Sequence, residues 1–569
     1  MVLQQFTFPE EGRAGVEELY LKIFGDARRN GEKIQLMQKA SLQTDTYFNG
    51  FFSEEWKKYT DLSKIGCTVE VQGNCIVEVF AVKKKGNGKK EQVLKRQHYQ
   101  SKERGKVRFS FSLSELSGMI AVRVIAVKNT LFYGGTWKYK KCLEDGGLEK
   151  TIQIALVICT YHKEKELLRN LDYLQKTVLK NFKSPLFGKI HIYIVDNGKT
   201  ISLQDQNIQV IANRNTGGSG GFARGMEEAV KEKERYGFSH ILLMDDDVII
   251  EKSSLEKTLA LLCCIKEEYR QSFIGGAMLR QDYPWIQHEA GGIWKDGRLK
   301  AIGQRQDLRR TEVLLQNRKK KEKPNYAAWW YCCIPLQYVE KNGYPMPFFL
   351  HFDDVEYSLR GKQEPIYLHG IGIWHEQFEQ KRGSALVYYD MRNTLFTYCM
   401  YGDMRKKWKI WKLVLYEWYQ AVSRYRYKDI ELIFKAVKDY KKGIVWLQKA
   451  DAEELHKIIC RMGYQWKRQE QIKDFEKEVQ KEELYKNSES VWKRIWRIFT
   501  INGNIFSAKR GTGYLPLGAS LDRFYRLKRV YLYDPSTGLG EWVEKDWIEL
   551  VKGCKRGIEM IVLLFKKKG

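Results

Sequence analysis

The segment Ser239-His-Ile-Leu-Leu-Met-Asp-Asp-Asp-Val-Ile-Ile250 contains an apolar run that ends in three consecutive aspartates. The pattern predicts a buried strand that stops in clustered acid. Three adjacent carboxylates repel one another, and without a cation their pKa values rise. In α/β proteins ligands usually bind at the carboxyl ends of strands, where Mg²⁺ or Mn²⁺ suits carboxylate oxygens. The alternative is an acidic loop after a core strand, and the triplet alone does not decide between them.

The size and composition of the chain limit its class. Its 569 residues predict about three domains. Hydrophobic residues make up 43% of the chain and aromatic residues 13%, which argues against global disorder. The formal net charge of +28 indicates a polyanionic partner, which would be nucleic acid, anionic lipid or a phosphorylated substrate.

Several signals bear on the cellular location. The 11 cysteines include no C-x-x-C pair, which favours a reducing cytosol over a disulfide framework. The N-terminus shows no basic segment followed by an apolar one, so we expect no secretory signal. No window reaches about 18 uninterrupted apolar residues, so we expect no membrane-spanning helix.

Residues 1–150 are expected to form an N-terminal β-sandwich domain. Three segments alternate apolar and polar side chains, and Gly-rich or Lys-rich turns are expected between them: Cys67–Gln72, Cys75–Phe80 and Val107–Ser112. Such alternation is typical of half-buried antiparallel strands.

Residues 151–400 show a different pattern, in which uninterrupted apolar strands alternate with helices. The predicted strands are Ile152–Cys159, Ile190–Val195, Ile208–Ala212 and Ile241–Met244, and the predicted helices run from Lys163 to Leu179 and from Phe222 to Tyr236. Strands that are apolar throughout indicate a parallel sheet covered on both faces. The region is therefore predicted to be a Rossmann-like α/β domain.

Residues 401–569 are predicted to be mainly helical, basic and aromatic. Six large side chains share one helical face: Trp408, Trp411, Leu415, Trp418, Tyr419 and Val422. This face packs against a neighbouring helix in one interpretation. In the other it contacts a membrane surface or a second subunit.

Polar residues follow each strand of the central domain. Thr160 and Lys163 follow the first strand, Asp196-Asn197-Gly198 follows the second, and the stretch Asn213–Phe222 follows the third. This stretch contains four glycines and leads into a helix, so its backbone N–H groups are placed to approach an anion. It is not a Walker A loop, because no Lys-Ser/Thr pair ends it.

A second acidic pair, Asp353-Asp354, lies after a proline-containing turn and at the start of a predicted helix. Asp353 would serve well as an N-cap. Two adjacent carboxylates together with Glu356 exceed what a cap requires, so one of them is a candidate general base.

Two further features carry both a functional and a structural interpretation. His375 ends an apolar strand, where it is either structural or a partner of the carboxylates on a metal. The adjacent Trp329 and Trp330 are suited either to stacking on a sugar or to core packing.

The order of these motifs resembles glycosyltransferase family 2, specifically the polymerising galactofuranosyltransferases that build bacterial cell-wall galactan. The matching elements are Asn215-x-Gly-Gly-x-Gly-Gly-Phe222, Asp245-Asp-Asp247, Trp329-Trp330, Asp353-Asp354 and Trp374-His375. The N-terminal Thr46-Tyr-Phe-Asn-Gly-Phe51, followed by Trp56, is also similar to that family. The resemblance covers most of the chain.

The resemblance implies a GT-A fold between the β-sandwich and the helical domain. It implies Asp354 as the catalytic base of an inverting transfer, and Asp245, Asp247 and His375 as ligands of Mn²⁺ or Mg²⁺. The residues implied to contact the donor are Thr160, Lys163, Asp196, Asn215, Gly218 and Asp246, and those implied to hold the acceptor or the donor sugar are Glu289, Trp329, Trp330 and Asp353.

The chain departs from the family at two places. His162-Lys163 stands where the family often has an arginine, so an ammonium replaces a guanidinium near the nucleotide. His351-Phe352 precedes the acidic pair, where a tryptophan is common, which puts the acceptor and linkage in question.

We therefore expect a glycosyltransferase that uses UDP-galactofuranose to extend a lipid-linked or cell-surface polysaccharide. It is expected on the cytoplasmic, inner face of the bacterial membrane as a peripheral protein attracted to anionic lipid, with a homo-oligomer through the C-terminal domain as a further expectation. Another donor, such as UDP-galactopyranose or a deoxysugar nucleotide, is the alternative within the fold. A nucleic-acid-binding protein is the alternative from another class; the scattered charge and the lack of a known module argue against it.

Overall fold

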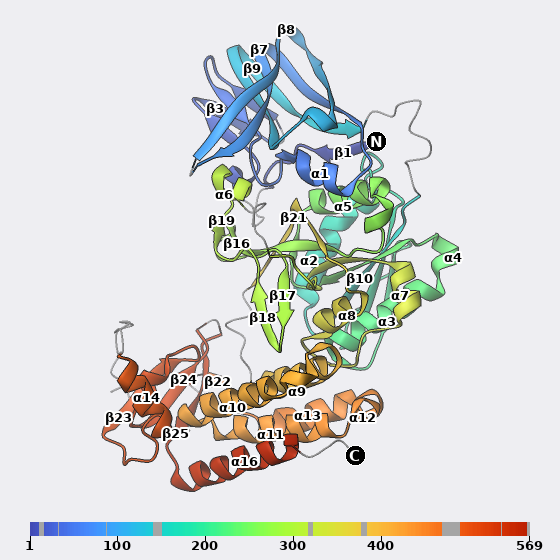
Figure 1. The fold of residues 1–569 in the computed structure, drawn as a ribbon. Coiled ribbons are helices and arrows are strands. Elements are labelled where there is room, and N and C mark those ends of the chain that lie inside the picture. Colours follow the sequence, from blue (N-terminus) through green and yellow to red (C-terminus); the bar gives the residue numbers. More distant parts are fainter. Residues whose placement is uncertain are drawn as a thin grey trace.

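The computed structural model describes residues 1–10, 16–31, 33–86, 88–139, 151–316, 322–376, 384–468, 490–535 and 537–565. Three regions follow one another along the chain, and Figure 1 shows them stacked in that order. A strand-rich N-terminal region (blue) lies on a central α/β domain (teal to yellow), and mostly helical elements (orange to red) lie at the opposite end.

The N-terminal region is rich in strands, as expected, and its nine strands belong to one hydrogen-bonded network. Strand β9 (Met119–Tyr139) pairs with β7 (Lys64–Lys85) and with four shorter strands, and β8 (Gly88–Ser112) pairs with β7. The remaining elements are β1 (Val2–Gln5), β2 (Lys22–Phe24), β3 (Ala27–Asn30), β4 (Lys33–Leu36), β5 (Ser41–Gln43), β6 (Phe51–Phe52) and helix α1 (Ser53–Tyr59).

The two strands predicted on either side of Gly73 are parts of the single strand β7, so the expected turn between them is wrong. The pairing register shifts at this position, and Gly73 has a φ of +114°. A Cβ atom there would overlap the carbonyl oxygen of Asn129. Gly73 therefore marks a β-bulge, which bends a long strand without ending it.

The central domain is built on a ten-stranded mixed sheet. Its first four strands are parallel in the order β12 (Ile208–Ala212), β11 (Ile190–Asp196), β10 (Ile154–Thr160) and β13 (His240–Asp245). The sheet continues through β20 (Tyr331–Pro335), β15 (Ile274–Arg280), β16 (Ile286–Glu289) and β19 (Gln306–Asp307), while β21 (Ile366–His375) pairs with β15 and with β14 (Ile249–Ile250). The predicted parallel sheet is thus the first half of a mixed one.

Both faces of this sheet are buried, which explains why its strands are apolar throughout. Along β10, Ala155 and Val157 join one hydrophobic cluster, whereas Leu156 and Ile158 join the other. Successive side chains of a strand point to opposite faces, so alternate residues fill separate cores. The helices of the domain are α2 (Glu164–Leu174), α3 (Gly217–Lys231), α4 (Lys233–Tyr236), α5 (Lys252–Cys264), α6 (Thr311–Gln316), α7 (Leu336–Asn342) and α8 (Asp353–Gly361).

Helix α5 joins the N-terminal region to the central domain. Lys257 is 1% exposed and donates from Nζ to the carbonyl oxygen of Phe48 at 2.6 Å. About one turn earlier on the same face, Ser254 Oγ donates to the carbonyl oxygen of Gly372 in β21 at 2.8 Å. Polar groups of α5 are therefore hydrogen-bonded to both regions, as buried polar groups must be.

The C-terminal region is mainly helical, as expected, but it also contains a four-stranded sheet that the sequence did not predict. Its helices are α9 (Ser384–Tyr401), α10 (Trp408–Ser423), α11 (Tyr427–Lys441), α12 (Ile444–Lys449), α13 (Ala452–Met462), α14 (Val491–Phe499), α15 (Leu521–Phe524) and α16 (Trp547–Phe565). The sheet has the order β22 (Lys467–Arg468), β25 (Leu539–Glu544), β24 (Leu527–Tyr533) and β23 (Arg510–Pro516). None of the helices in the described residues is long and apolar enough to cross a bilayer.

Part of the aromatic face predicted on α10 packs against α16. Trp418 Nε1 donates to the carbonyl oxygen of Gly553 at 2.8 Å, and the ring centroids of Trp411 and Phe565 are 3.9 Å apart. Val422 is fully buried, whereas Trp408 remains 54% exposed. The packing interpretation is therefore confirmed for Trp411, Trp418 and Val422, whereas Trp408 and Leu415 are exposed.

Candidate active site

The aspartate triplet and His375 meet because a two-residue strand pairs with the end of a long one. Strand β13 ends at Asp245, and the chain turns into β14, whose Ile249 pairs with Trp374 of β21. His375 is the last residue of β21. The Nε2 atom of His375 lies 2.9 Å from Oδ1 of Asp247 and 4.0 Å from Oδ2 of Asp245.

These three side chains have the chemistry of a site for a divalent cation. The Nδ1 atom of His375 donates to the carbonyl oxygen of Glu376 at 2.5 Å, which orients the imidazole with Nε2 toward the aspartates. A second hydrogen bond of this kind is typical of metal-binding histidines. Among the described residues, no group of three or more His, Cys, Asp or Glu forms a ready-made metal cage. The donor types fit Mn²⁺ or Mg²⁺.

Helix α2 fixes the turn that carries the triplet. Asn170 is buried and donates from Nδ2 to the carbonyl oxygens of Asp246 at 2.9 Å and Val248 at 2.7 Å. Burial raises the pKa of Asp246 to about 7, with a counteracting contribution from Thr160 at the end of β10. Asn170 was missed from the sequence because an asparagine inside a helix carries no signal of its distant partner.

The residues predicted to bind the donor lie around the triplet at the same edge of the sheet. Lys163 Nζ is 3.8 Å from Oδ2 of Asp247, so the predicted ammonium stands beside the acids. Asp196 is 1% exposed and accepts backbone N–H groups from Gly198, Thr200 and Ile201 at 2.6 to 2.9 Å. Asp196 therefore shapes the loop after β11, and its contact with a nucleotide remains a prediction.

The glycines after β12 have two different roles. Helix α3 begins at Gly217, five residues earlier than predicted, so the glycines lie within its first turns. Cβ atoms at Gly221 and Gly225 would overlap the side chains of Cys159 and Val157, so these glycines let α3 pack closely on β10. Gly218 has open space around it, which leaves it accessible to an anion at the start of the helix.

Two asparagines hold this turn in place. Asn215 Oδ1 accepts the backbone N–H of Gly217 at 3.1 Å. Asn197, to which the sequence assigned no specific role, donates from Nδ2 to the carbonyl oxygen of Gly217 at 3.0 Å. Gly217 has a φ of +70°, a conformation that favours glycine.

The second acidic pair begins helix α8 after an unusual loop. Phe349, His351 and Phe352 all have positive φ values, between 60° and 71°. Phe352 occupies the N-cap position, so Asp353 is not the cap of this helix. Strained backbone of this kind persists only where surrounding structure enforces it, and it is common at functional sites.

Helix α9 enforces the conformation of that loop. Asn393 Nδ2 bonds to the carbonyl oxygens of Phe348, Leu350 and His351 at 3.2, 2.7 and 3.0 Å. Arg392 donates to the carbonyl oxygen of Phe348 at 2.6 Å. Both residues are buried, and neither was singled out from the sequence.

Burial changes the acidity of the carboxyl groups around Asp354. It raises the pKa of Asp354 itself, and the charge of Asp245 adds to this increase, whereas His351 lowers the value. Glu289, at the end of β16, is 7% exposed, and its Oε1 has no hydrogen-bond partner among the described residues. Burial and the nearby Asp354 raise the pKa of Glu289 to about 8. Glu289 is therefore protonated at neutral pH and able to donate a hydrogen bond.

Trp329 and Trp330 are both core residues. They are 5% and 8% exposed, and they pack into different hydrophobic clusters. Trp330 Nε1 donates to the carbonyl oxygen of Gly276 at 2.9 Å, whereas Trp329 Nε1 is buried without a partner among the described residues. The core interpretation therefore accounts for most of both rings, and contact of either indole with a sugar remains a prediction.

Two family descriptions match the chain. "Glycosyltransferase like family 2" matches residues 152–372, which include the aspartate triplet and the acidic pair. "Galactofuranosyltransferase 2 N-terminal" matches residues 3–139. The fold of the central domain is that of a GT-A glycosyltransferase domain. The central domain therefore matches glycosyltransferase family 2.

Two curated relatives carry the name galactofuranosyltransferase GlfT2. The protein of Mycobacterium tuberculosis is 25% identical over 453 residues, covering 71% of this chain and 66% of its own length. The protein of Mycolicibacterium smegmatis is 24% identical over 455 residues, covering 71% of this chain and 65% of its own length. The chain thus spans just under two thirds of each relative.

Among solved structures, a mannosyltransferase from Pyrobaculum calidifontis in complex with GDP-Man and Mn²⁺ covers 57% of this chain and 87% of its own. The sequence identity is 11% and the TM-score is 0.28, so this similarity carries no argument about function.

The contacts of Asn393 predict that Asn393→Ala loosens the loop before the acidic pair. The substitution leaves loop carbonyls without donors, so amide hydrogen exchange over Phe348–Phe352 should accelerate by about tenfold or more. Asn342→Ala is the matched control, because the side chain of Asn342 donates to the carbonyl oxygen of Tyr338 within its own helix and, among the described residues, forms no hydrogen bond with the loop. Equal exchange of the loop in wild type and Asn393→Ala would show that α9 does not hold it.

Proposed function

We propose that this protein is a metal-dependent, inverting hexosyltransferase that transfers galactofuranose from UDP-galactofuranose to a growing cell-surface or lipid-linked glycan. The observation that carries the proposal is the meeting, at one sheet edge, of the Asp245–Asp247 triplet and His375 with a second, buried acidic pair. The names of the two curated relatives support the choice of galactofuranose.

Asp354 is the proposed catalytic base. Its raised pKa makes it a better proton acceptor near neutral pH than an exposed aspartate. It takes the proton of an acceptor hydroxyl as that oxygen attacks the anomeric carbon and the nucleoside diphosphate leaves on the opposite face, which inverts the configuration. Glu289, protonated at neutral pH, holds a sugar hydroxyl by donating a hydrogen bond without repelling Asp354. Asp353, whose carboxyl group interacts with that of Asp354, is a further proposed acceptor contact.

The donor is assigned to the residues at the strand ends. Lys163 and the open start of α3 at Gly218 offer positive charge and backbone N–H groups to the diphosphate. Asp245, Asp247 and His375 would hold Mn²⁺ or Mg²⁺, which when bound neutralises charge on the departing diphosphate. The other proposed donor contacts are Thr160, Asp196, Asn215 and Asp246.

Helix α14 is the proposed membrane-binding element. Trp492, Ile495, Trp496 and Phe499 recur at helical spacing, yet all are exposed, Trp492 by 79% and Phe499 by 78%. Lys493, Arg494 and Arg497 accompany them in the same helix. An exposed apolar stripe with basic neighbours is typical of helices that lie on anionic membranes. We therefore assign the membrane contact to α14 and not to the aromatic face of α10, part of which packs inside the protein.

The activity is tested by a donor screen with the purified full-length protein. UDP-galactofuranose should support transfer to a galactofuranose disaccharide, whereas UDP-galactopyranose and deoxysugar nucleotides should not. Asp354→Asn should lower turnover by about 10² to 10⁴, because the base is lost, while calorimetry shows UDP binding nearly unchanged.

Robust turnover of another sugar, with none of galactofuranose, would overturn the choice of donor. Normal turnover by Asp354→Asn would instead exclude Asp354 as the base.

The proposed cation site predicts weaker Mn²⁺ binding in His375→Ala. Loss of one protein ligand should reduce the affinity for Mn²⁺ by about tenfold or more, as measured by electron paramagnetic resonance of free Mn²⁺ during a titration. His98→Ala, which removes an exposed histidine of the N-terminal region, is the control. Superimposable titration curves for wild type and His375→Ala would remove His375 from the site.

The proposed role of α14 is tested by flotation with vesicles that contain anionic lipid. Wild-type protein should float at moderate salt, and Trp492→Glu should reduce the floated fraction severalfold, since a charge replaces an interfacial anchor. Phe182→Glu is the matched control, because Phe182 is 76% exposed on the central domain. A wild-type protein that stays wholly in solution would contradict membrane binding. An equal decrease of the floated fraction in both variants would contradict the role of α14.

A further inference from the structure

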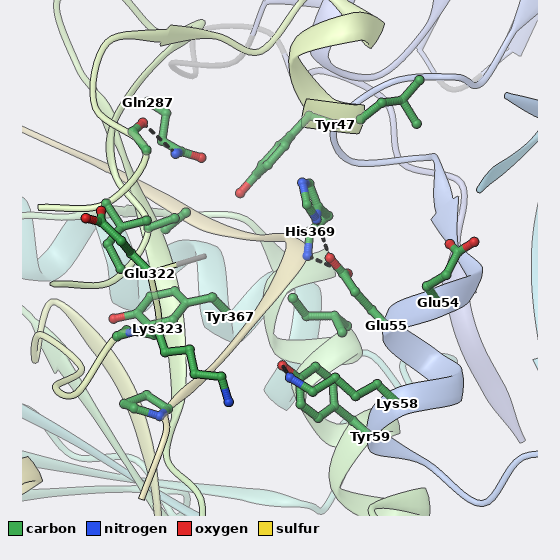
Figure 2. Close-up of a pocket in the computed structure, with 18 of the residues that line it drawn as sticks. Tyr47, Glu54, Glu55, Lys58, Tyr59, Gln287, Glu322, Lys323, Tyr367 and His369 are labelled. Atoms are coloured by element: carbon green, nitrogen blue, oxygen red, sulfur yellow. Dashed lines mark hydrogen bonds and ion pairs between the residues drawn. The ribbon is translucent and has the colours of Figure 1, made fainter. Parts of the chain in front are cut away.

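A cavity of about 660 Å³ lies between the N-terminal region and the central domain (Figure 2). Helix α1 contributes one wall through Glu55, Lys58 and Tyr59. The opposite wall comes from β16 and from the first half of β21. The volume falls within the range of sites that bind small molecules.

The lining of the cavity favours an uncharged ligand. Four glutamates and four lysines line it, so their formal charges cancel. Some of them already pair across the cavity wall: Lys323 Nζ lies 2.8 Å from Glu364 Oε2, and Lys58 Nζ lies 3.8 Å from Glu364 Oε1. A nucleotide or another polyanion would meet as many carboxylates as ammonium groups. A ligand with many hydroxyl groups can instead donate to the carboxylates and accept from the lysines.

Rigid rings complete the lining. Tyr47, Tyr59 and Tyr367 contribute aromatic surface, and His369 stacks on Phe52 with a centroid distance of 4.0 Å. Glu55 holds His369 by accepting its backbone N–H at 3.0 Å and by a second hydrogen bond to its ring. Figure 2 shows this pair at the cavity wall. Flat apolar rings among hydrogen-bonding groups are the usual means of binding a molecule that is apolar on one face and polar at its edges.

Strand β16 connects this cavity with the catalytic carboxyl groups. Gln287 lines the cavity, and Glu289, two residues farther along the strand, interacts with Asp354. Both side chains are buried, and two residues of strand span about 7 Å. Gln287 at the cavity and Glu289 at the proposed acceptor position are therefore neighbours on the same side of β16.

Tyr367 forms a second connection. Its ring fits against the backbone of Gly275 and Gly291, where Cβ atoms would collide with it. In Figure 2 its hydroxyl points away from His369 and Glu55. That hydroxyl is buried without a hydrogen-bond partner among the described residues, and its pKa is raised by burial and then by the charge of Glu289. Tyr367 therefore lines the cavity and also interacts with Glu289 of the proposed site.

We infer that this cavity is a binding site for a neutral glycan and that it holds sugar residues of the acceptor upstream of the one that reacts. The identification of that glycan as the acceptor rests on the proposed function. The cavity itself is defined by its lining, its balanced charge and its position next to Glu289.

Ser117→Trp tests this inference, because Ser117 lines the cavity from the N-terminal region and lies on a different domain from the proposed catalytic residues. The indole should fill part of the cavity. Ser114→Trp is the matched control, since Ser114 is exposed three residues away and does not line the cavity. Lys84→Trp blocks the cavity from another segment and replaces Ser117→Trp if that variant does not fold.

Two measurements with full-length protein are compared. Binding of a galactofuranose hexasaccharide, measured by calorimetry, should weaken by about tenfold in Ser117→Trp and remain unchanged in Ser114→Trp. In transfer assays the KM for the hexasaccharide should rise by a similar factor, whereas the KM for UDP-galactofuranose and the turnover of a disaccharide acceptor should stay within about twofold. Maltohexaose serves as the unrelated glycan.

The outcomes separate the inference from the proposed function. Binding of the hexasaccharide that Ser117→Trp abolishes, in a protein that transfers no sugar, would support the cavity and overturn the function. Normal transfer with unchanged hexasaccharide binding in both blocking variants would overturn the inference. An equal loss of transfer activity with the disaccharide and with the hexasaccharide would also overturn the inference, because a site for upstream sugars affects only the longer acceptor.

Discussion

The pairing of β14 with the end of β21 is the interaction on which the site depends. Ile249 and Ile250 hydrogen-bond to Trp374 and Ile373, which brings the turn after β13 against the last residue of β21. The same strand presents Trp374 to Phe48 of the N-terminal region, with ring centroids 5.6 Å apart, and carries Tyr367 and His369 at the cavity. One strand thus serves the proposed cation site, the contact between regions and the proposed glycan site.

The burial of several carboxyl groups is the second constraint on the proposed site. Burial raises the pKa values of Asp246, Asp354 and Glu289, and the carboxyl groups raise one another further. Such a cluster is costly unless protons or cations offset its charge. The structure offsets part of the cost locally, through Lys163 beside Asp247 and His351 near Asp354. The rest of the charge is suited to a bound cation and to proton transfer, which are the two tasks proposed for this edge of the sheet.

The roles of several residues depend on neighbours that are distant in the sequence. Gly221 and Gly225 belong to the packing of α3 on β10, whereas Gly218 alone keeps open space. Trp329 and Trp330 fill two different cores. Asn170 and Asn393, which position the two acidic motifs from neighbouring helices, have no local signature, because an amide can bond to any carbonyl that the fold brings to it.

The sequence by itself determined the alternation of apolar strands and helices, the strand that ends at Asp245, the acidic pair at Asp353 and the amphipathic stripe of the C-terminal helices. These follow from local periodicity, which records whether each side chain faces a core or water. Only the tertiary structure decided that His375 lies 2.9 Å from Asp247, that α9 holds the loop before Asp354, and that a cavity opens between α1 and β16. These features depend on contacts between residues tens to hundreds of positions apart. The local periodicity of a single sequence does not show which distant residues will meet.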